Sequence, residues 1–155
     1  MVKIKICGTT NLEDALLCSR EGADALGFIF TKKSPRYINE KQAAKIIGQI
    51  DPFVVTVGVF LDEEKEKVLK IADMLNLDIL QFHGNESPAY CNFFRPKFKV
   101  IKVLFAQNRP FAKAVAGYNV DAYLFDLRQE EKLKGKNILE KEYLQEILSL
   151  IKEGE

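Results

Sequence analysis

The sequence predicts an α/β fold in which about six βα units build one parallel sheet. Short apolar segments rich in β-branched and aromatic residues alternate regularly with segments of helical periodicity. Most of the short segments are continuously apolar, as is typical of parallel strands that are buried on both faces. The strands should therefore be joined by right-handed crossovers.

The six apolar segments are the predicted strands. They span residues 2–7, 25–30, 54–60, 79–82, 100–104 and 122–125.

Helix-start signals lie between these segments. Asn11 is a predicted N-cap for a helix over 12–21 that stops at Gly22, and Asn39 precedes the next helix. Further helix starts are predicted at Asp62, before a helix over 63–75, at Ser87-Pro88 and at Asn108-Arg109-Pro110. A last helix is predicted over 141–152. The charge run over 62–67 is interpreted as a solvated helix face.

Length and charge limit the function. The chain has 155 residues, of which 47% are apolar, and this suits a single domain over 1–155. Lys and Arg number 23 against 22 Asp and Glu, so no basic excess favours nucleic acid as a partner. No apolar segment approaches the roughly 20 residues of a membrane span, and Met1-Val2-Lys3 leads directly into a strand without room for a signal peptide.

The cysteines indicate a reducing compartment. Cys7, Cys18 and Cys91 are odd in number, widely separated and without metal-ligand spacing. We therefore expect reduced thiols, a cytoplasmic location and no metal site.

Polar side chains follow four of the six predicted strands. Cys7 ends the first, Lys32, Lys33 and Arg36 follow the second, Gln81 and His83 share one face of the fourth, and Asp126 ends the sixth. The carboxyl ends of parallel strands meet at one edge of the sheet, so these groups should form one site. Taken singly, Cys7 suits a core thiol, Asp126 a helix cap and His83 an ordinary strand end. The sequence has no Walker loop or GxGxxG motif, so the prediction of a site depends on the clustering of these polar residues.

Several segments resemble the phosphoribosylanthranilate isomerase family, which carries out an Amadori rearrangement in tryptophan biosynthesis. They are KICGTTNLEDA at 5–15, GADALGFIF at 22–30, SPRYI at 34–38, VGVF at 57–60, LQFHGNE at 80–86 and LFD at 124–126. The resemblance covers about residues 2–126.

The resemblance implies a role for each site residue. Cys7 would be the general base that removes the C2 proton of the ribosyl unit, and Asp126 the general acid that protonates the ring oxygen. Arg36 would contact the anthranilate carboxylate, and Gln81 and His83 would line the substrate pocket. No cofactor is implied.

The family fold is a (βα)₈ barrel, and this chain departs from it after the sixth unit. The seventh and eighth units, with their phosphate-binding loops, have no counterpart, and residues 127–137 replace a glycine-rich loop. We therefore expect an incomplete barrel in which lysines such as Lys32, Lys33, Lys134 and Lys136 would meet the substrate phosphate. Open edges at the first and sixth strands predict a homo-oligomer.

Two alternatives stay open at this point. A barrel remnant could bind a small anionic ligand without catalysis, or serve only as an assembling scaffold. A flavodoxin-like open sheet would also fit the βα rhythm.

Overall fold

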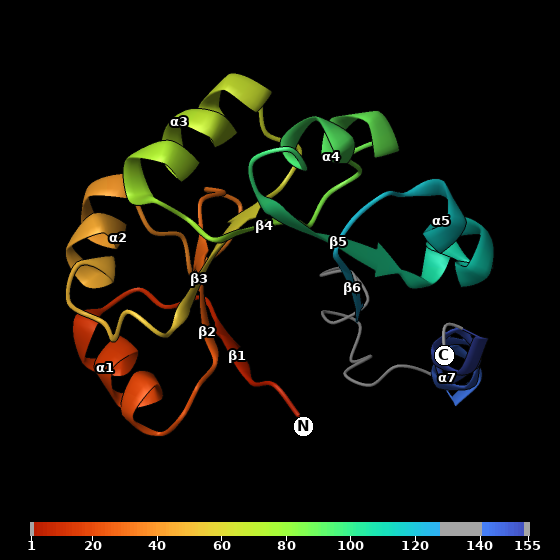
Figure 1. Ribbon diagram of the computed structural model, residues 1–155, viewed down its shortest axis with the longest axis horizontal. Coiled ribbons are helices and arrows are strands. Elements are labelled where there is room, and N and C mark those ends of the chain that lie inside the picture. Colours follow the sequence, from red (N-terminus) through yellow and green to blue (C-terminus); the bar gives the residue numbers. More distant parts are fainter. Residues whose placement is uncertain (1, 128–140, 154–155) are drawn as a thin grey trace.

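Six parallel strands form one curled sheet in the computed structural model, which describes residues 2–127 and 141–153 (Figure 1). The strands follow one another in chain order: β1 (Lys5–Cys7), β2 (Ala25–Ile29), β3 (Val55–Phe60), β4 (Ile79–Phe82), β5 (Lys99–Phe105) and β6 (Ala122–Asp126). This confirms the predicted barrel-like repeat of six βα units. A flavodoxin-like sheet is excluded, because its strand order reverses whereas this order is sequential.

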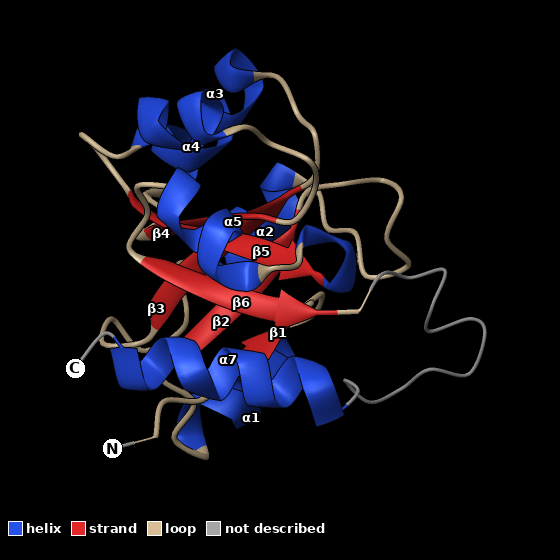
Figure 2. Ribbon diagram, turned by 90° about the vertical axis from the view of Figure 1, so that its right-hand side faces the viewer, coloured by secondary structure: helices blue, strands red, loops and turns tan. Residues whose placement is uncertain are grey.

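Helices follow the strands and cover the convex side of the sheet (Figures 1 and 2). They are α1 (Leu12–Arg20), α2 (Glu40–Ile47), α3 (Lys65–Leu75), α4 (Pro88–Phe94), α5 (Phe111–Gly117) and α7 (Lys141–Glu153), with a 3₁₀ turn, η1 (Ala106–Asn108), after β5. No helix among the residues described here has the length and apolar character needed to cross a membrane.

Three predicted N-caps are confirmed. The side-chain oxygens of Asn11, Asn39 and Ser87 accept hydrogen bonds from backbone N–H groups three residues later, at 2.8, 2.9 and 3.2 Å. Each satisfies a donor that a helix start leaves without a partner inside the helix. Pro88 occupies the first turn of α4, where a missing N–H costs little.

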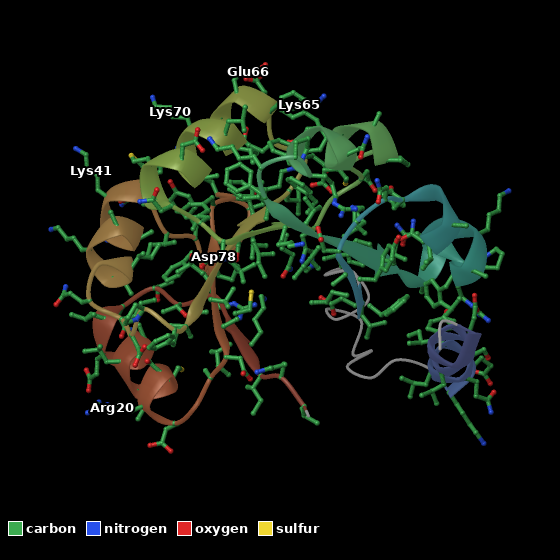
Figure 3. The ribbon with its side chains drawn as sticks, in the orientation of Figure 1. Arg20, Lys41, Lys65, Glu66, Lys70 and Asp78 are labelled. Atoms are coloured by element: carbon green, nitrogen blue, oxygen red, sulfur yellow. The ribbon has the colours of Figure 1, made fainter. Side chains whose placement is uncertain are left out.

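The predicted start of α3 at Asp62 is wrong, because Asp62 has another task. Its φ of 49° turns the chain, and its carboxylate accepts the N–H of Asn85 from the loop after β4 at 2.6 Å. The helix begins at Lys65 instead. Glu66 points away from the sheet in Figure 3, so the solvated helix face is confirmed for the part of the charge run that is helical, Lys65–Lys67.

Two other elements differ in detail from the prediction. Strand β1 covers Lys5–Cys7 rather than 2–7, and α5 begins at Phe111 without a side-chain cap, since the Asn108 side chain accepts the N–H of Phe105. Helix α7 matches its prediction, although Leu144 and Leu148 of its apolar stripe are 43% and 56% exposed.

The main core lies between the sheet and the helices. Phe28, Leu80 and Phe82 point outward from β2 and β4 and are fully buried there. Neighbouring strands place Ile29, Val59 and Gln81 in register on the opposite, concave face. Side chains alternate between faces along a strand, so the concave face carries the groups that can reach the barrel interior.

One hydrogen-bonded ring occurs three times at the amino-terminal ends of the strands. Asp24, Asp78 and Asp121 stand directly before β2, β4 and β6, and their carboxylates accept the N–H of a residue in or beside the preceding strand at 2.8, 2.7 and 2.9 Å. That residue's carbonyl accepts the N–H of the same aspartate in return. Each ring thus ties two neighbouring strands together at their start.

Candidate active site

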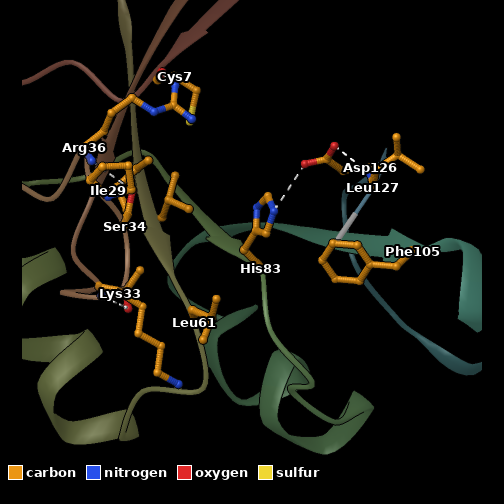
Figure 4. A pocket seen from close by; sticks show the side chains of 13 residues that line it. Cys7, Ile29, Lys33, Ser34, Arg36, Leu61, His83, Phe105, Asp126 and Leu127 are labelled. Atoms are coloured by element: carbon orange, nitrogen blue, oxygen red, sulfur yellow. Dashed lines mark hydrogen bonds and ion pairs between the residues drawn. The ribbon is translucent and has the colours of Figure 1, made fainter. Parts of the chain in front are cut away.

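A cavity of about 400 Å³ opens at the carboxyl ends of the strands (Figure 4). It receives side chains from β1, β2, β3, β4, β5 and β6 or from the loops that follow them. Its lining consists of Cys7, Ile29, Thr31, Lys33, Ser34, Pro35, Arg36, Val59, Leu61, His83, Phe105, Asp126 and Leu127. Both charged and apolar side chains therefore face one space of the size usual for a small-molecule ligand.

Cys7 reaches this cavity because the neighbouring strand has no side chain beside it. Gly27 of β2 pairs with Cys7, and a Cβ atom at Gly27 would come within 2.9 Å of the Cys7 Sγ. The backbone N–H of Gly8 donates to the Gly27 carbonyl at 2.8 Å and closes the end of β1. The thiol is thus held on the concave face at the mouth of the barrel.

Arg36 lies across the turn that follows Cys7. Its Nη1 donates to the carbonyl oxygen of Cys7 at 2.6 Å. A side chain at Gly8 would meet the Arg36 Cδ at 2.7 Å, and Gly8 has a φ of 89°, a conformation that favours glycine. Ser34 accepts the backbone N–H of Arg36 at 3.1 Å and shapes the loop after β2. The local sequence therefore brings a guanidinium beside the thiol.

His83 and Asp126 meet across the cavity from Cys7 (Figure 4). The Nε2 atom of His83 lies 3.5 Å from Oδ2 of Asp126, and both side chains are partly exposed to the cavity. The Asp126 Oδ1 accepts the N–H of Leu127 at 2.7 Å, which fixes the carboxylate at the end of β6. The ring of Phe105 packs edge-on against His83 at 5.6 Å between centroids.

Gln81 lies behind His83 and is 1% exposed. Its Nε2 is 3.0 Å from Nδ1 of His83. Gln81 is not among the residues that line the cavity. A substrate-binding role for Gln81 stays a prediction.

A buried ion pair supports the loop that carries His83. Lys102 of β5 and Glu86 have side-chain exposures of 3% and 1%, and their charged atoms are 2.8 Å apart. The Lys102 ammonium also donates to the Gly84 carbonyl at 2.7 Å, while the Glu86 carboxylate accepts the N–H groups of Gly84 and Asp62 at 2.9 Å. The pair therefore ties the loops after β3 and β4 to strand β5.

This pair was not predicted from the sequence. A lysine within the apolar segment 100–104 was its available signal, because a charge in a buried strand needs a partner. The partner itself could not be identified without the fold. The apolar lining residues Leu61, Phe105 and Leu127 were missed as well, since apolar strand ends resemble ordinary core.

The structure thus brings four of the five predicted site residues to one cavity, namely Cys7, Arg36, His83 and Asp126. Their chemical roles stay predictions. Among the lysines proposed for a phosphate, Lys33 lines the cavity, Lys32 does not, and Lys134 and Lys136 lie outside the described residues.

The cysteines differ in their surroundings. Cys91 is fully buried in α4, and burial raises the pKa of its thiol to about 11. Such a thiol stays protonated near neutral pH and belongs to the core. Cys7 is half-buried at the cavity, which makes it the thiol with access to a ligand.

Residues 4–150 match the family model described as N-(5'-phosphoribosyl)anthranilate (PRA) isomerase. The N-(5'-phosphoribosyl)anthranilate isomerase of Citrifermentans bemidjiense is 49% identical over 126 residues, which are 81% of this chain and 60% of that protein. The chain spans about three fifths of the length of the curated relatives it matches first.

Solved structures agree in fold. A phosphoribosylanthranilate isomerase in complex with reduced 1-(o-carboxyphenylamino)-1-deoxyribulose 5-phosphate is 39% identical, with a TM-score of 0.77 over 87% of this chain and 70% of that one. Monomers of the dimeric enzyme from Thermotoga maritima are 38% identical, with a TM-score of 0.74 over 82% of this chain and 64% of that one.

Proposed function

Since this chain belongs to the N-(5'-phosphoribosyl)anthranilate isomerase family, we propose that it isomerises N-(5'-phosphoribosyl)anthranilate to the corresponding 1-(carboxyphenylamino)-1-deoxyribulose 5-phosphate in tryptophan biosynthesis. The observation that carries this proposal is the placement of Cys7 and Asp126 on opposite sides of one cavity, with Arg36 beside the thiol. A base and an acid on facing walls suit a reaction that moves protons within one substrate.

Ring opening is the first chemical step. Asp126 gives its proton to the ring oxygen of the ribosyl unit while the bond between that oxygen and C1 breaks, and the broken bond's electron pair stays on oxygen. The anthranilate nitrogen shares its lone pair with C1 and forms a protonated Schiff base. Asp126 is left as a carboxylate.

Proton removal at C2 follows. The Cys7 thiolate takes the C2 proton, and the electron pair forms a double bond between C1 and C2 as the Schiff-base nitrogen becomes neutral. C1 then takes a proton while the C2 hydroxyl loses one and becomes the ketone. The product is an isomer of the substrate, so the substrate gains and loses no atoms or electrons overall.

Arg36 supplies the recognition of the anthranilate end. A guanidinium donates two parallel hydrogen bonds to a carboxylate, and one Arg36 nitrogen is already fixed by the Cys7 carbonyl. The carboxylate of the substrate would therefore be held next to the base.

Loss of substrate fluorescence from freshly prepared phosphoribosylanthranilate tests the proposal. We expect Cys7→Ala and Asp126→Asn each to lower kcat about a hundredfold or more, because each removes one proton-transfer group. Cys18→Ala, a thiol on α1 outside the cavity, and Asp73→Asn, an exposed carboxyl on α3, are the matched controls and should retain wild-type turnover.

Unchanged turnover in both site variants would refute the assigned roles. An absence of turnover in the wild-type chain, with a ligand-induced rise in melting temperature, would instead favour the alternative of a non-catalytic anion-binding protein. An absence of both responses would favour a scaffold.

The substrate phosphate needs a cation, and we propose that Lys33 contributes one. Lys33 lines the cavity in the loop after β2. We expect Lys33→Met to raise KM about tenfold with little change in kcat, because a charged hydrogen bond to the phosphate is lost. Lys32→Met is the neighbouring control.

We further propose that the chain forms a homo-oligomer. Ile4 and Ile6 at the β1 edge are 53% and 41% exposed, and Leu144 and Leu148 of α7 also present apolar surface. The dimeric state of the Thermotoga maritima relative supports the proposal. Sedimentation at micromolar concentration should show association, and a well-folded monomer would contradict it.

A cytoplasmic location is part of the same proposal, because the chain's free thiols, Cys7, Cys18 and Cys91, suit a reducing compartment.

A further inference from the structure

The buried amide of Gln81 determines what His83 can do in the cavity. An amide nitrogen only donates hydrogen bonds, and the Gln81 Nε2 lies 3.0 Å from Nδ1 of His83. Nδ1 must therefore accept this bond with its lone pair. In a neutral imidazole the proton then resides on Nε2.

The opposite orientation of the Gln81 amide is less favourable. Within Gln81 the Oε1 atom is buried without a hydrogen-bond partner, as are two other side-chain atoms of the described residues. With the amide reversed, the two N–H donors would take the place of that oxygen instead. Proteins tolerate a buried carbonyl oxygen without a partner better than buried N–H groups without one.

The surroundings of Gln81 give its amide few other choices. It is paired in register with Val59 of β3 and Ile101 of β5 on the concave face. An amide among aliphatic neighbours is costly to bury, and at this position an aliphatic residue would pack without that cost. The hydrogen bond to His83 thus explains why a glutamine, and not an aliphatic residue, occupies this position.

The backbone of His83 is fixed as well. The His83 N–H donates to the Phe60 carbonyl at 2.8 Å. The next residue in the chain, Gly84, is also held, because its carbonyl accepts a hydrogen bond from the Lys102 ammonium. Only rotation of the His83 side chain remains, and Gln81 and Phe105 contact the ring.

We propose that Gln81 is a positioning residue that holds His83 in the tautomer with its proton on Nε2, so that His83 presents an N–H to Asp126. Nε2 lies 3.5 Å from the Asp126 Oδ2. Such contacts commonly tighten when substrate binds.

This inference rests on the proposed function in one respect, the role of Asp126 as the acid. When Asp126 gives up its proton to the ring oxygen, a negative charge develops on its carboxylate. The Nε2–H of His83 then stabilises that charge. A histidine with its proton on Nδ1 would turn a lone pair toward the carboxylate instead and would disfavour the step.

The test uses the fact that the chain contains one histidine. In ¹⁵N-labelled protein, two-bond proton–nitrogen NMR at pH 8, where an ordinary imidazole is neutral, reports on His83 alone. Nε2 couples to both carbon-bound ring protons, whereas Nδ1 couples strongly to one, so the two nitrogens can be told apart. We expect Nε2 to carry the proton in the wild-type chain.

Three variants complete the experiment. Gln81→Met removes the donor at similar volume and should give a mixture of tautomers, with a severalfold loss in kcat and little change in KM. Gln81→Glu offers an acceptor and should move the proton to Nδ1. Gln49→Met, an exposed glutamine beyond the end of α2, is the control and should change neither the tautomer nor kcat.

The outcomes separate this inference from the proposed function. A wild-type proton on Nδ1, or an unchanged tautomer in a folded Gln81→Glu variant, would overturn the inference even if turnover is normal. An Nε2 proton that responds to Gln81 in a chain without turnover would support the positioning role and refute the proposed activity. Should Gln81→Met fail to fold, the wild-type and Gln81→Glu measurements still decide.

Discussion

The two ends of the sheet are built on different plans. At the amino-terminal ends, one ring of aspartate and backbone hydrogen bonds is repeated at Asp24, Asp78 and Asp121. At the carboxyl ends, each strand delivers a different group, such as Cys7, His83 or Asp126. Repetition indicates a task that is the same for these three strand pairs, which is to hold neighbouring strands in register. The different side chains at the carboxyl ends indicate that each of these positions has its own role toward the ligand.

The Lys102–Glu86 pair is a structural feature located at the functional end. Unlike the three aspartates, it lies between the sheet and the helices and binds several backbone groups of two loops at once. The amino-terminal rings should therefore behave as independent units, whereas the pair should behave as one coupled unit.

Breaking the pair should have the largest effect on stability. Lys102→Met or Glu86→Leu leaves one buried charge without its partner, and we expect each to lower the free energy of unfolding by about 3–5 kcal/mol. Urea unfolding measures this change. Lys97→Met, which removes an exposed pair with Asp73, is the control and should cost about 1 kcal/mol or less.

The double variant Lys102→Met/Glu86→Leu tests the coupling. Both charges are gone, so it should recover a large part of the stability that either single variant loses. Turnover should stay low, since the loop around His83 loses its anchors at Gly84. Additive losses in the double variant would contradict the view of the pair as one unit.

The amino-terminal rings should give smaller and additive effects. Asp78→Ala and Asp121→Ala each remove charged hydrogen bonds to the backbone, and we expect losses of about 2 kcal/mol each. The two carboxylates are two strands apart, about 10 Å, so the double variant should lose the sum to within about 0.5 kcal/mol. Turnover per folded molecule should not change; a fall in kcat would show that the two ends are not separate.

The contrast also explains what the sequence could and could not predict. Continuous apolar segments predicted the parallel strands, and polar residues after them predicted the cluster at Cys7, Arg36, His83 and Asp126. The cluster follows from topology alone, because parallel strands bring their carboxyl ends together whatever their side chains.

Contacts between loops could not be predicted in this way. Asp62 resembles a helix cap, yet its carboxylate bonds to Asn85 of another loop. Asp24, Asp78 and Asp121 each resemble ordinary turn residues, and their rings become visible only when the neighbouring strand is in place. Because side chains alternate between the two faces of a strand, the sequence predicted that Gln81 and His83 share one face. The burial of the Gln81 side chain could not be predicted, because it depends on the curl of the sheet.

Acid should weaken the amino-terminal rings at Asp24 and Asp121, and this is the smallest of the expected effects. Contacts with the Lys3 side chain and the Ile4 N–H hold the pKa of Asp24 below its ordinary value. At Asp121 burial by itself would raise the pKa, but the N–H of Val100 and the nearby Lys99 and Arg95 hold it lower in sum. A carboxyl group whose folded pKa is depressed contributes stability above its unfolded pKa of about 3.9.

That stability is lost as the pH falls through the folded pKa. We therefore expect the free energy of unfolding to decline below about pH 4, with a shallower decline in Asp121→Asn because its side chain no longer titrates. Urea unfolding between pH 6 and pH 2.5 measures both curves. Parallel curves for the two proteins would show that the ring at Asp121 does not contribute through its charge, and would leave its hydrogen-bond geometry as the source of the strand pairing.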